Sequence, residues 1–532
     1  MINTEEILKH YFYPLDSNIF VIKNLPEVIK GTLFSRYSRT AKDVKQLFLD
    51  EFYKNEDLVG VFDVQGQTEK LQTSKAEDFY ERVLVGYGDD SVAELGGAHV
   101  ALESISMLAT KNIEEHRIGL SPLEKSTRYV YYDKKVSGDY LYYRDPVLMN
   151  SDFKSLYVKT CDMLFDVYSK IVRDSQALLM DVFPGDVGDK AYTASVRAKS
   201  CDLARSLLPL SAYTNMGVFG NGRAFEYLLT DMLGSNLDEV SDISQSMYKA
   251  LSNVIGPFIK RSKSERGDRY RQYRFRLAEL VRSLYDTDVA SHASYYEHPM
   301  VKLVEFDKQP IEKILAAMIY QSSEVDYESA LQLAIAMPMK EREKVIMKLG
   351  GLREYRQHKP LRACEEAYVS FEVVADWGVY KDLMRHRTLT RHKKLFSSNY
   401  GYYIPPEIEM LGMRKIFVEA MDRAVDAYVR VSAKYPVQAQ YLVTHGSYTP
   451  FYLKINLRAL SHLVELRSIP QGHSSYRFVA QEMARLVCDE CPVLRDSLFK
   501  FVDYNNYDLE RLEAFKRIEK TAKEKGLSAF TE

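Results

Sequence analysis

Apolar residues along this chain recur mostly at helical spacing. A return every three or four positions predicts a helix, because that period lines up one helix face. The ranges with this spacing are 91–115, 155–182, 238–257, 410–434 and 476–503. Two short runs rich in β-branched and aromatic residues, Ile19–Lys23 and Val301–Phe306, instead predict strands. Long helices with a few short strands predict a mixed α/β (α+β) fold.

The pattern of motifs indicates that the chain repeats itself once. One order, a glutamate, then His-Arg, then Tyr-Thr, then Asn-x-Arg, occurs twice. The first occurrence uses Glu94, His116, Arg117, Tyr213, Thr214, Asn221 and Arg223, and the second uses Glu365, His386, Arg387, Tyr448, Thr449, Asn456 and Arg458. We therefore predict two tandem copies, 1–260 and 296–532, joined by a basic helical linker at 261–295.

The stretch 260–276 carries eight basic residues with interleaved aromatics. Such a stretch can bind nucleic acid, and it is equally typical of a helix with a solvated charged face. Lys plus Arg number 72 and Asp plus Glu 74, a net charge of −2. Because a nucleic-acid binder usually carries a basic excess, we expect no nucleic-acid partner.

Composition adds few constraints. The chain has 532 residues, 46% hydrophobic and 27% charged, which excludes a mainly disordered protein. No apolar run reaches the roughly 18–20 residues that span a bilayer, and the first residues lack the apolar segment of a signal peptide. Five scattered cysteines are typical of the reduced cytoplasm, where we expect this protein. Cys488 and Cys491 lack a matching second pair, so we predict no metal site.

Cationic side chains cluster in the second copy. Arg385, His386 and Arg387 begin a short run rich in arginine, whose donors suit phosphate or carboxylate, although a basic surface helix has the same composition. Downstream, polar residues lie on both faces of one predicted helix, which includes Arg458, His462 and Arg467. Polar groups on both faces indicate a helix end wedged between subunits or domains.

The first copy carries Glu124, Ser126, Arg128 and Tyr129 after its His-Arg pair, and Arg205 before Leu-Pro. With these motifs in this order, the chain resembles the flavin-dependent thymidylate synthases, the ThyX family. Their signature is RHR-x-x-S-x-N-E-x-S-x-R-Y, followed by LPL-x-x-YT and an N-x-R…L-x-L-R helix. The resemblance implies two tandem ThyX-like domains, each a small sheet packed with long helices, that form a pseudo-dimer.

The two copies depart from the signature in complementary ways. In the first, Glu115 replaces the leading arginine, and Met232 stands where the family has its activating arginine. In the second, RHR is intact, but the S-x-R-Y part is lost and Gln440 replaces the arginine before LPL. Asp382 replaces a family glutamine there. Because the family's sites lie between subunits, one composite site per chain is implied.

The resemblance assigns roles to residues of both copies. The implied dUMP-binding residues are Glu124, Ser126, Arg128, Arg205, Asp382, Arg385 and Arg467. The implied FAD-binding residues are Ser91, Arg385, His386, Arg387, Asn456, Arg458 and His462. Arg467 is the implied catalytic group, a fixed cation that stabilises the N3-deprotonated pyrimidine. The counterpart of Ser91 in the second copy is Arg362, which could still meet a flavin phosphate.

The implied reaction is reductive methylation of dUMP to dTMP, with FAD as cofactor and NADPH and methylenetetrahydrofolate as co-substrates. No cysteine lies in a recognisable nucleophile setting, which agrees with the arginine route. We expect a homodimer, a pseudo-tetramer of ThyX-like units. Two alternatives stay open: a flavin enzyme acting on another pyrimidine nucleotide, for which Asp382 is the discriminating residue, and a decayed nucleotide- or flavin-binding scaffold.

Overall fold

The computed structural model describes residues 4–54, 90–116, 118–283 and 295–525. The chain forms two compact units. Unit 1 comprises 1–105, 109–124 and 214–291, and unit 2 comprises 106–108, 125–213 and 292–532. Residues 125–213, which the sequence assigns to the first copy, thus pack with the second copy. The division of the sequence at 261–295 is a different boundary and stays a prediction.

Unit 1 contains a three-stranded sheet in the order β3-β7-β4. In it, β4 (Leu120–Glu124) pairs antiparallel with β7 (Tyr213–Asn221), and β3 (Gly97–Ser106) lies on the other side of β7. Its two longest apolar helices, α9 (Gly222–Met232) and α10 (Asp238–Ile259), pack against each other. The remaining elements are α1 (Thr4–Tyr11), β1 (Phe12–Tyr13), β2 (Val21–Ile22), α2 (Glu27–Tyr37), α3 (Val44–Leu47), η1 (Phe48–Tyr53), η3 (Asp90–Glu94), α5 (Met107–Glu114), η5 (Lys260–Lys263) and α11 (Glu265–Ser283).

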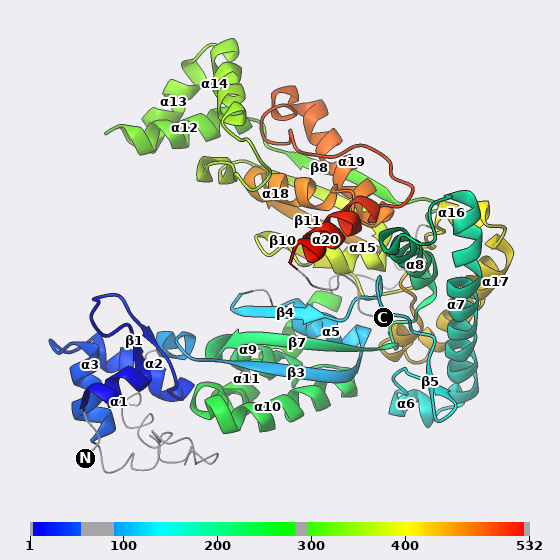
Figure 1. The fold of residues 1–532 in the computed structure, drawn as a ribbon, viewed down its shortest axis with the longest axis horizontal. Coiled ribbons are helices and arrows are strands. Elements are labelled where there is room, and N and C mark those ends of the chain that lie inside the picture. The colour runs from blue at the N-terminus through cyan, green and yellow to red at the C-terminus, as the bar shows by residue number, and fades with distance from the viewer. Residues whose placement is uncertain (1–3, 55–89, 117, 284–294, 526–532) are drawn as a thin grey trace. The chain divides into compact units, whose positions relative to one another are not determined.

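Unit 2 contains an antiparallel four-stranded sheet in the order β10-β11-β9-β8 (Figure 1). Its strands are β8 (Met300–Phe306), β9 (Tyr368–Asp376), β10 (Leu389–Lys393) and β11 (Tyr448–Asn456). Side chains on both faces of β9 are buried, so helices or loops cover both faces of the sheet centre. Over this sheet lie α18 (Leu457–Arg467), α19 (Ser474–Glu490) and α15 (Trp377–Leu383), which carry the polar residues discussed below.

First-copy helices complete unit 2. The 29-residue helix α7 (Lys154–Val182) packs against α8 (Lys190–Ala204) and against α17 (Arg414–Ser432) of the second copy (Figure 1). The remaining elements are β5 (Lys135–Val136), β6 (Asp139–Tyr140), α6 (Pro146–Met149), η4 (Arg205–Leu207), α12 (Pro310–Ser322), α13 (Tyr327–Ala336), α14 (Met339–Gly351), η7 (Arg362–Glu365), α16 (Pro406–Met410), η8 (Gln438–Leu442), η9 (Pro492–Leu494) and α20 (Leu512–Glu524).

The Leu-Pro segment of the first copy runs alongside its counterpart in the second. Leu210 N–H donates to the Val443 carbonyl over 2.8 Å, and His445 N–H donates to the Leu208 carbonyl over 2.9 Å. Gly446 N–H donates to the Ser206 carbonyl over 2.8 Å. A Cβ at Gly446 would meet the Ser206 Cβ at 2.9 Å, so glycine permits this approach. We call this pairing of 206–211 with 441–446 the seam.

The order of elements confirms the tandem arrangement. In each copy a short 3-10 turn precedes a strand, a helix and a second strand, and a later strand ends in an asparagine. The Asn221 and Asn456 side chains cap α9 and α18 in the same way, each accepting a backbone N–H over 2.8 Å. The motif glutamate and arginine also pair in both copies, Glu94 with Arg223 at 2.7 Å and Glu365 with Arg458 at 2.8 Å.

The predictions of secondary structure are mostly confirmed. The mixed α/β fold class holds, α7, α10 and α17 match their predicted ranges closely, and β8 matches its predicted strand. The helix predicted at 476–503 ends at Glu490, just before Pro492, which lacks the N–H that a helix interior needs. The strand predicted at Ile19–Lys23 is reduced to β2, which pairs only with β1.

The helix predicted over 91–115 is wrong for residues 97–106, which form β3. The buried positions of this strand include Ala98, Leu102 and Ile105, so its spacing imitates a helix. Ser104 has a φ of 56°, in the left-handed region, which breaks the two-residue alternation of a regular strand. Only α5 in this range is an α-helix.

The basic stretch forms η5 and the start of α11, so the helix that we predicted there is confirmed over 265–283. Tyr273 and Phe275 are each 57% exposed, which fits the solvated face that the sequence also allowed. Residues 284–294 of the predicted linker lie outside the described residues. No helix in the described part of the chain is long and apolar enough to cross a membrane.

A buried ion pair ties α18 to the segment after α14, and its loss should destabilise unit 2. Arg353 donates to both oxygens of Glu465, over 3.0 and 2.6 Å. Breaking such a pair leaves one buried charge uncompensated, which typically costs about 3–5 kcal/mol. Arg353→Met should therefore lower the free energy of unfolding, measured in urea, by about this amount. Adding Glu465→Leu should restore most of the loss, and a double variant no more stable than the single would contradict this account.

Candidate functional site

Arginines of both copies converge on one carboxylate in unit 2. Arg467, the last residue of α18, lies 3.6 Å from Asp382 of α15, measured between Nη1 and Oδ1. Burial raises the pKa of the Asp382 carboxyl, but four guanidinium groups outweigh burial and hold this pKa below its ordinary value. In order of effect these groups belong to Arg467, Arg385, Arg205 and Arg128. We call this set the arginine cluster.

Tyr476 of α19 lies between an arginine of each copy. The guanidinium carbons of Arg128 and Arg467 are each 5.6 Å from the centre of its ring. Arg128 Nη1 also donates to the Tyr476 hydroxyl over 3.1 Å. Stacking on an aromatic face restricts where both cations can point. Sequence reasoning missed Tyr476, because no motif marks it.

Arg128 is fixed from behind by a buried carboxylate. Its Nε and Nη2 donate to the two oxygens of Asp202 over 2.9 and 3.0 Å, and Arg511 donates to the same carboxylate over 2.6 Å. Burial raises the pKa of Asp202, but the two arginines outweigh burial and hold it well below its ordinary value. The fork geometry leaves Arg128 Nη1 directed at Tyr476. Asp202 stands three residues before Arg205, the only sequence signal for it.

Arg205, in η4, is 3% exposed. Its Nη2 is buried and has no hydrogen-bond partner within the described residues. A Cβ at Gly378 would meet this nitrogen at 2.8 Å, so glycine leaves room for the guanidinium. Burial, followed by the charge of Arg205, lowers the pKa of His473 far below its ordinary value. Since His473 caps α19, the unsatisfied guanidinium nitrogen lies near the start of a helix, where anions are favoured.

His386 connects the arginine cluster to a pocket. Arg467 Nε donates to His386 Nε2 over 3.0 Å, so this nitrogen carries no proton and the proton of a neutral ring is on Nδ1. Burial first, then the charges of Arg467 and His462, lower the pKa of His386 well below its ordinary value, which keeps the ring neutral. The His386 ring centre is 5.7 Å from that of His462, which lines the pocket.

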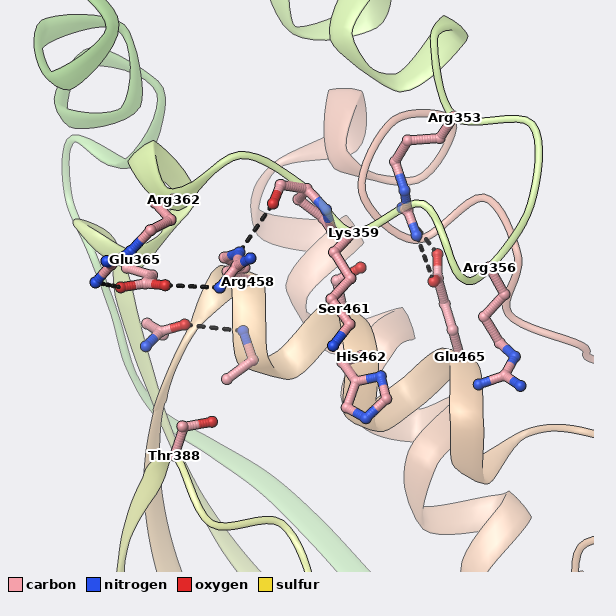
Figure 2. A pocket seen from close by; sticks show the side chains of 13 residues that line it. Arg353, Arg356, Lys359, Arg362, Glu365, Thr388, Arg458, Ser461, His462 and Glu465 are labelled. Atoms are coloured by element: carbon pink, nitrogen blue, oxygen red, sulfur yellow. Dashed lines mark hydrogen bonds and ion pairs between the residues drawn. The ribbon is translucent and has the colours of Figure 1, made fainter. Parts of the chain in front are cut away.

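The pocket has a volume of about 470 Å³ and lies beside the start of α18 (Figure 2). Its cationic lining residues are Arg353, Arg356, Lys359, Arg362 and Arg458, and His462 also lines it. Both lining carboxylates are paired. Glu365 accepts from Arg458 over 2.8 Å and from Arg362 over 3.2 Å, while Glu465 pairs with Arg353. Because its cations outnumber its carboxylates, this pocket favours an anionic ligand. We call it the basic pocket.

The chemistry of the basic pocket fits a flavin dinucleotide, the cofactor of the resembled family. Arg356 and Lys359 form no ion pair within the described residues, and both line the pocket together with His462 (Figure 2). Burial, then the charges of Lys359 and Arg356, lower the pKa of His462. Cations that repel one another suit a pyrophosphate, which binds through charge-assisted hydrogen bonds.

The structure distributes the predicted flavin residues unevenly. Asn456, Arg458 and His462 line the basic pocket, as does Arg362. His386 lies behind His462, whereas Arg385 and Arg387 are exposed between α15 and β10. Ser91 is exposed on η3 in unit 1. Sequence reasoning missed Arg353, Arg356 and Lys359, although the basic run 353–362 could have indicated them.

The first-copy residues that were predicted to bind dUMP also divide between the two units. Ser126 lies in unit 2, and its hydroxyl accepts the Arg128 backbone N–H over 3.2 Å. Glu124 lies in unit 1, where it is buried beside Lys111 at 3.2 Å. In the first copy His116 faces Asp231 at 3.4 Å, where the second copy pairs His386 with an arginine. An acidic partner at that position disfavours an anionic ligand in the first copy.

Comparison with known proteins supplies the family. The family model described as Thy1, thymidylate synthase complementing protein, matches residues 48–255 and 302–493, once in each copy. A UPF0159 protein of Chlamydia pneumoniae is 41% identical over 525 residues, which cover 97% of this chain and 98% of that protein. A flavin-dependent thymidylate synthase of Thermotoga neapolitana is 23% identical over 188 residues, 32% of this chain and 84% of that protein.

Among solved structures, the UMP/dUMP methylase PolB from Streptomyces cacaoi, crystallised with 5-Br dUMP, is similar with 18% sequence identity and a TM-score of 0.32. The match covers 39% of this chain and 98% of that one. The family model covers most of both copies, and the motif order agrees with it. The chain therefore belongs to the Thy1 family, as a tandem two-copy member.

Proposed function

We propose that this protein is a flavin-dependent thymidylate synthase. It methylates dUMP to dTMP with methylenetetrahydrofolate as one-carbon donor, FAD as cofactor and NADPH as reductant. One observation carries the proposal: Arg128 of the first copy and Arg467 of the second each lie 5.6 Å from the centre of the Tyr476 ring, and the charge of Arg205 acts on the same Asp382 carboxylate as theirs. Neither copy alone has this set. We therefore propose that the composite site forms within one chain.

The phosphate of dUMP would bind to the first-copy arginines. Arg205 offers a buried guanidinium nitrogen that needs an acceptor, and burial of an unsatisfied donor is costly until one arrives. Arg128 is held in one orientation by Asp202, so binding would lose little side-chain entropy. The start of α19 adds backbone N–H groups and a favourable dipole.

Arg467 would stabilise the negative charge that develops on the pyrimidine when N3 loses its proton. A fixed cation in a water-poor site is effective because it needs no reorganisation as the charge appears. Three contacts restrict Arg467: neutral His386 accepts from Nε, Asp382 lies beside Nη1, and the Tyr476 ring faces the guanidinium. These contacts would hold the cation in one orientation when the nucleotide binds.

The basic pocket would hold FAD. Arg356, Lys359 and Arg458 would supply donors for its pyrophosphate, and Asn456 caps the start of α18, which carries Arg458. When bound, FAD would supply the hydride chemistry of the reaction. His462 lines this pocket, and its ring centre is 5.7 Å from that of His386, which accepts from Arg467 of the arginine cluster. The roles predicted for Ser91, Glu124, Ser126, Arg385 and Arg387, and the homodimer, remain part of the proposal.

A second candidate substrate follows from Asp382. Its ionised carboxylate offers only acceptors, where the resembled family offers a glutamine amide. An acceptor favours a base edge that carries a donor, such as the amino group of cytosine. Methylation of dCMP or CMP in preference to dUMP, in assays run side by side, would favour this alternative.

We expect one FAD per chain, not two, because the basic pocket with its cationic lining belongs to the second copy. Arg458 and Arg223 are a matched pair, since each neutralises the motif glutamate of its own copy. Arg458→Ala should weaken FAD binding about tenfold or more, as expected for a lost charged hydrogen bond. Arg223→Ala should leave binding unchanged. Fluorescence titration gives both values, and two FAD per chain or equal effects would contradict the assignment.

Activity should depend on arginines of both copies. Arg467→Ala should lower the rate of dUMP-dependent dTMP formation about 100- to 1,000-fold, because a fixed cation is lost from the transition state. Arg128→Gln should raise the KM for dUMP about 10- to 100-fold, as a charged phosphate contact is lost. Arg485→Gln, an exposed arginine of α19, is the control.

The same assays separate the proposal from its alternatives. Each variant should keep wild-type circular dichroism and FAD affinity, so that lost activity reflects the nucleotide site. Full activity of Arg128→Gln would show that the first copy contributes nothing. No turnover of any pyrimidine nucleotide by the wild-type protein with FAD bound would favour the decayed scaffold.

A further inference from the structure

A second pocket, separate from the basic pocket, lies in the first-copy part of unit 2. Its volume is about 320 Å³. Tyrosines and basic residues dominate its lining, which includes Tyr129, Tyr131, Tyr132, Lys125, Lys134 and Arg197. No carboxylate lines it, and Asp133, the nearest acid in the sequence, is not among its lining residues. We call it the tyrosine pocket.

The cations of the tyrosine pocket rest on aromatic rings and lack counter-ions. Lys125 Nζ is 4.9 Å from the centre of the Tyr132 ring, and the Arg197 guanidinium is 4.5 Å from that of Tyr131. Burial, then the charge of Lys134, lowers the pKa of Lys125. Within the described residues these three cations form no salt bridge. Nearby cations without acids favour an anion with more than one negative group.

The rim of the pocket is apolar and exposed. Tyr129 is 50% exposed, Leu141 44% and Val130 37%. Aromatic and aliphatic side chains that stay in water around a hollow favour a ligand with an apolar, planar part. The chemistry that fits both features is an aromatic ring that carries several carboxylates.

One lining residue of the tyrosine pocket is next in the chain to a residue of the arginine cluster. Tyr129 follows Arg128 directly, and the Arg511 guanidinium lies 5.2 Å from the centre of the Tyr129 ring. Arg511 and Arg128 share the Asp202 carboxylate. A long ligand could therefore react at the arginine cluster with one end and occupy the tyrosine pocket with the other.

We propose that the tyrosine pocket binds the aminobenzoyl-polyglutamate tail of the one-carbon donor. The inference rests on the proposed function, which requires a folate, and it names where the unreactive end of that folate lies. The aminobenzoyl ring stacks on the tyrosines, and the glutamate carboxylates reach Lys125, Lys134 and Arg197. The pterin end stays free to approach the pyrimidine.

The test is a titration of the FAD-loaded protein with p-aminobenzoyl-triglutamate, in which equilibrium dialysis measures the bound ligand. Lys125→Gln and Lys134→Gln should each weaken binding about tenfold, as expected for one lost charged contact. Lys190→Gln, at the exposed start of the helix that carries Arg197, should leave it unchanged. Circular dichroism of all three variants should match the wild type.

Other outcomes would overturn the inference. One is absence of binding to the wild-type protein, and another is an equal loss of affinity in Lys190→Gln. A third is displacement of the tail by inorganic phosphate at equal concentration, which would mean that the pocket takes any anion. The titration needs no turnover, so its failure is distinct from failure of the proposed function. In the active enzyme, Lys125→Gln and Lys134→Gln should also raise the KM for the triglutamate donor about tenfold while the KM for dUMP stays constant.

Discussion

The backbone pairing at the seam is the constraint on which the rest of unit 2 depends. Hydrogen bonds run in both directions between 206–211 and 441–446, so neither segment can shift without breaking several of them. Arg205 immediately precedes this paired segment, and Gly446 permits its close approach. Through the seam, a residue that the sequence assigns to the first copy lies in the arginine cluster, whose proposed catalytic group, Arg467, comes from the second copy.

The seam also explains why buried carboxylates lie among the arginines of the two copies. Bringing arginines of two copies together would be unfavourable without counter-ions, because like charges repel strongly at low dielectric. Asp202 and Asp382 are counter-ions to these arginines, and the surrounding guanidinium groups keep the pKa of each carboxyl below its ordinary value. The arginines that we propose to bind phosphate and to activate the pyrimidine are thus held in place by protein contacts alone. The buried Nη2 of Arg205, which has no hydrogen-bond partner within the described residues, is the donor that we propose for the phosphate.

The sequence predicted the features that lie in motifs. The repeat follows from motif order, the mixed fold class follows from the apolar spacing, and the convergence of Arg128 and Arg205 with Arg467 was implied by the resemblance to the ThyX family. Tyr476 and Arg511 could not be predicted, because their contacts join elements far apart in the chain and no local pattern marks them. The strand at 97–106 was missed for another reason: its irregular backbone at Ser104 gives buried positions a helical spacing. Asn456 carries a structural role that its motif did not reveal, as the cap of α18.

The most direct test of a composite site within one chain is to mix two impaired variants and to assay them at a dUMP concentration below the wild-type KM. Arg128→Gln and Arg467→Ala chains, coexpressed with different tags and purified as a mixed assembly, should show no more activity than the sum of the separate variants. Both arginines of one site then come from the same chain, and no mixed assembly contains an intact pair. Recovery of activity well above that sum would mean that the site forms between chains, and would contradict this account.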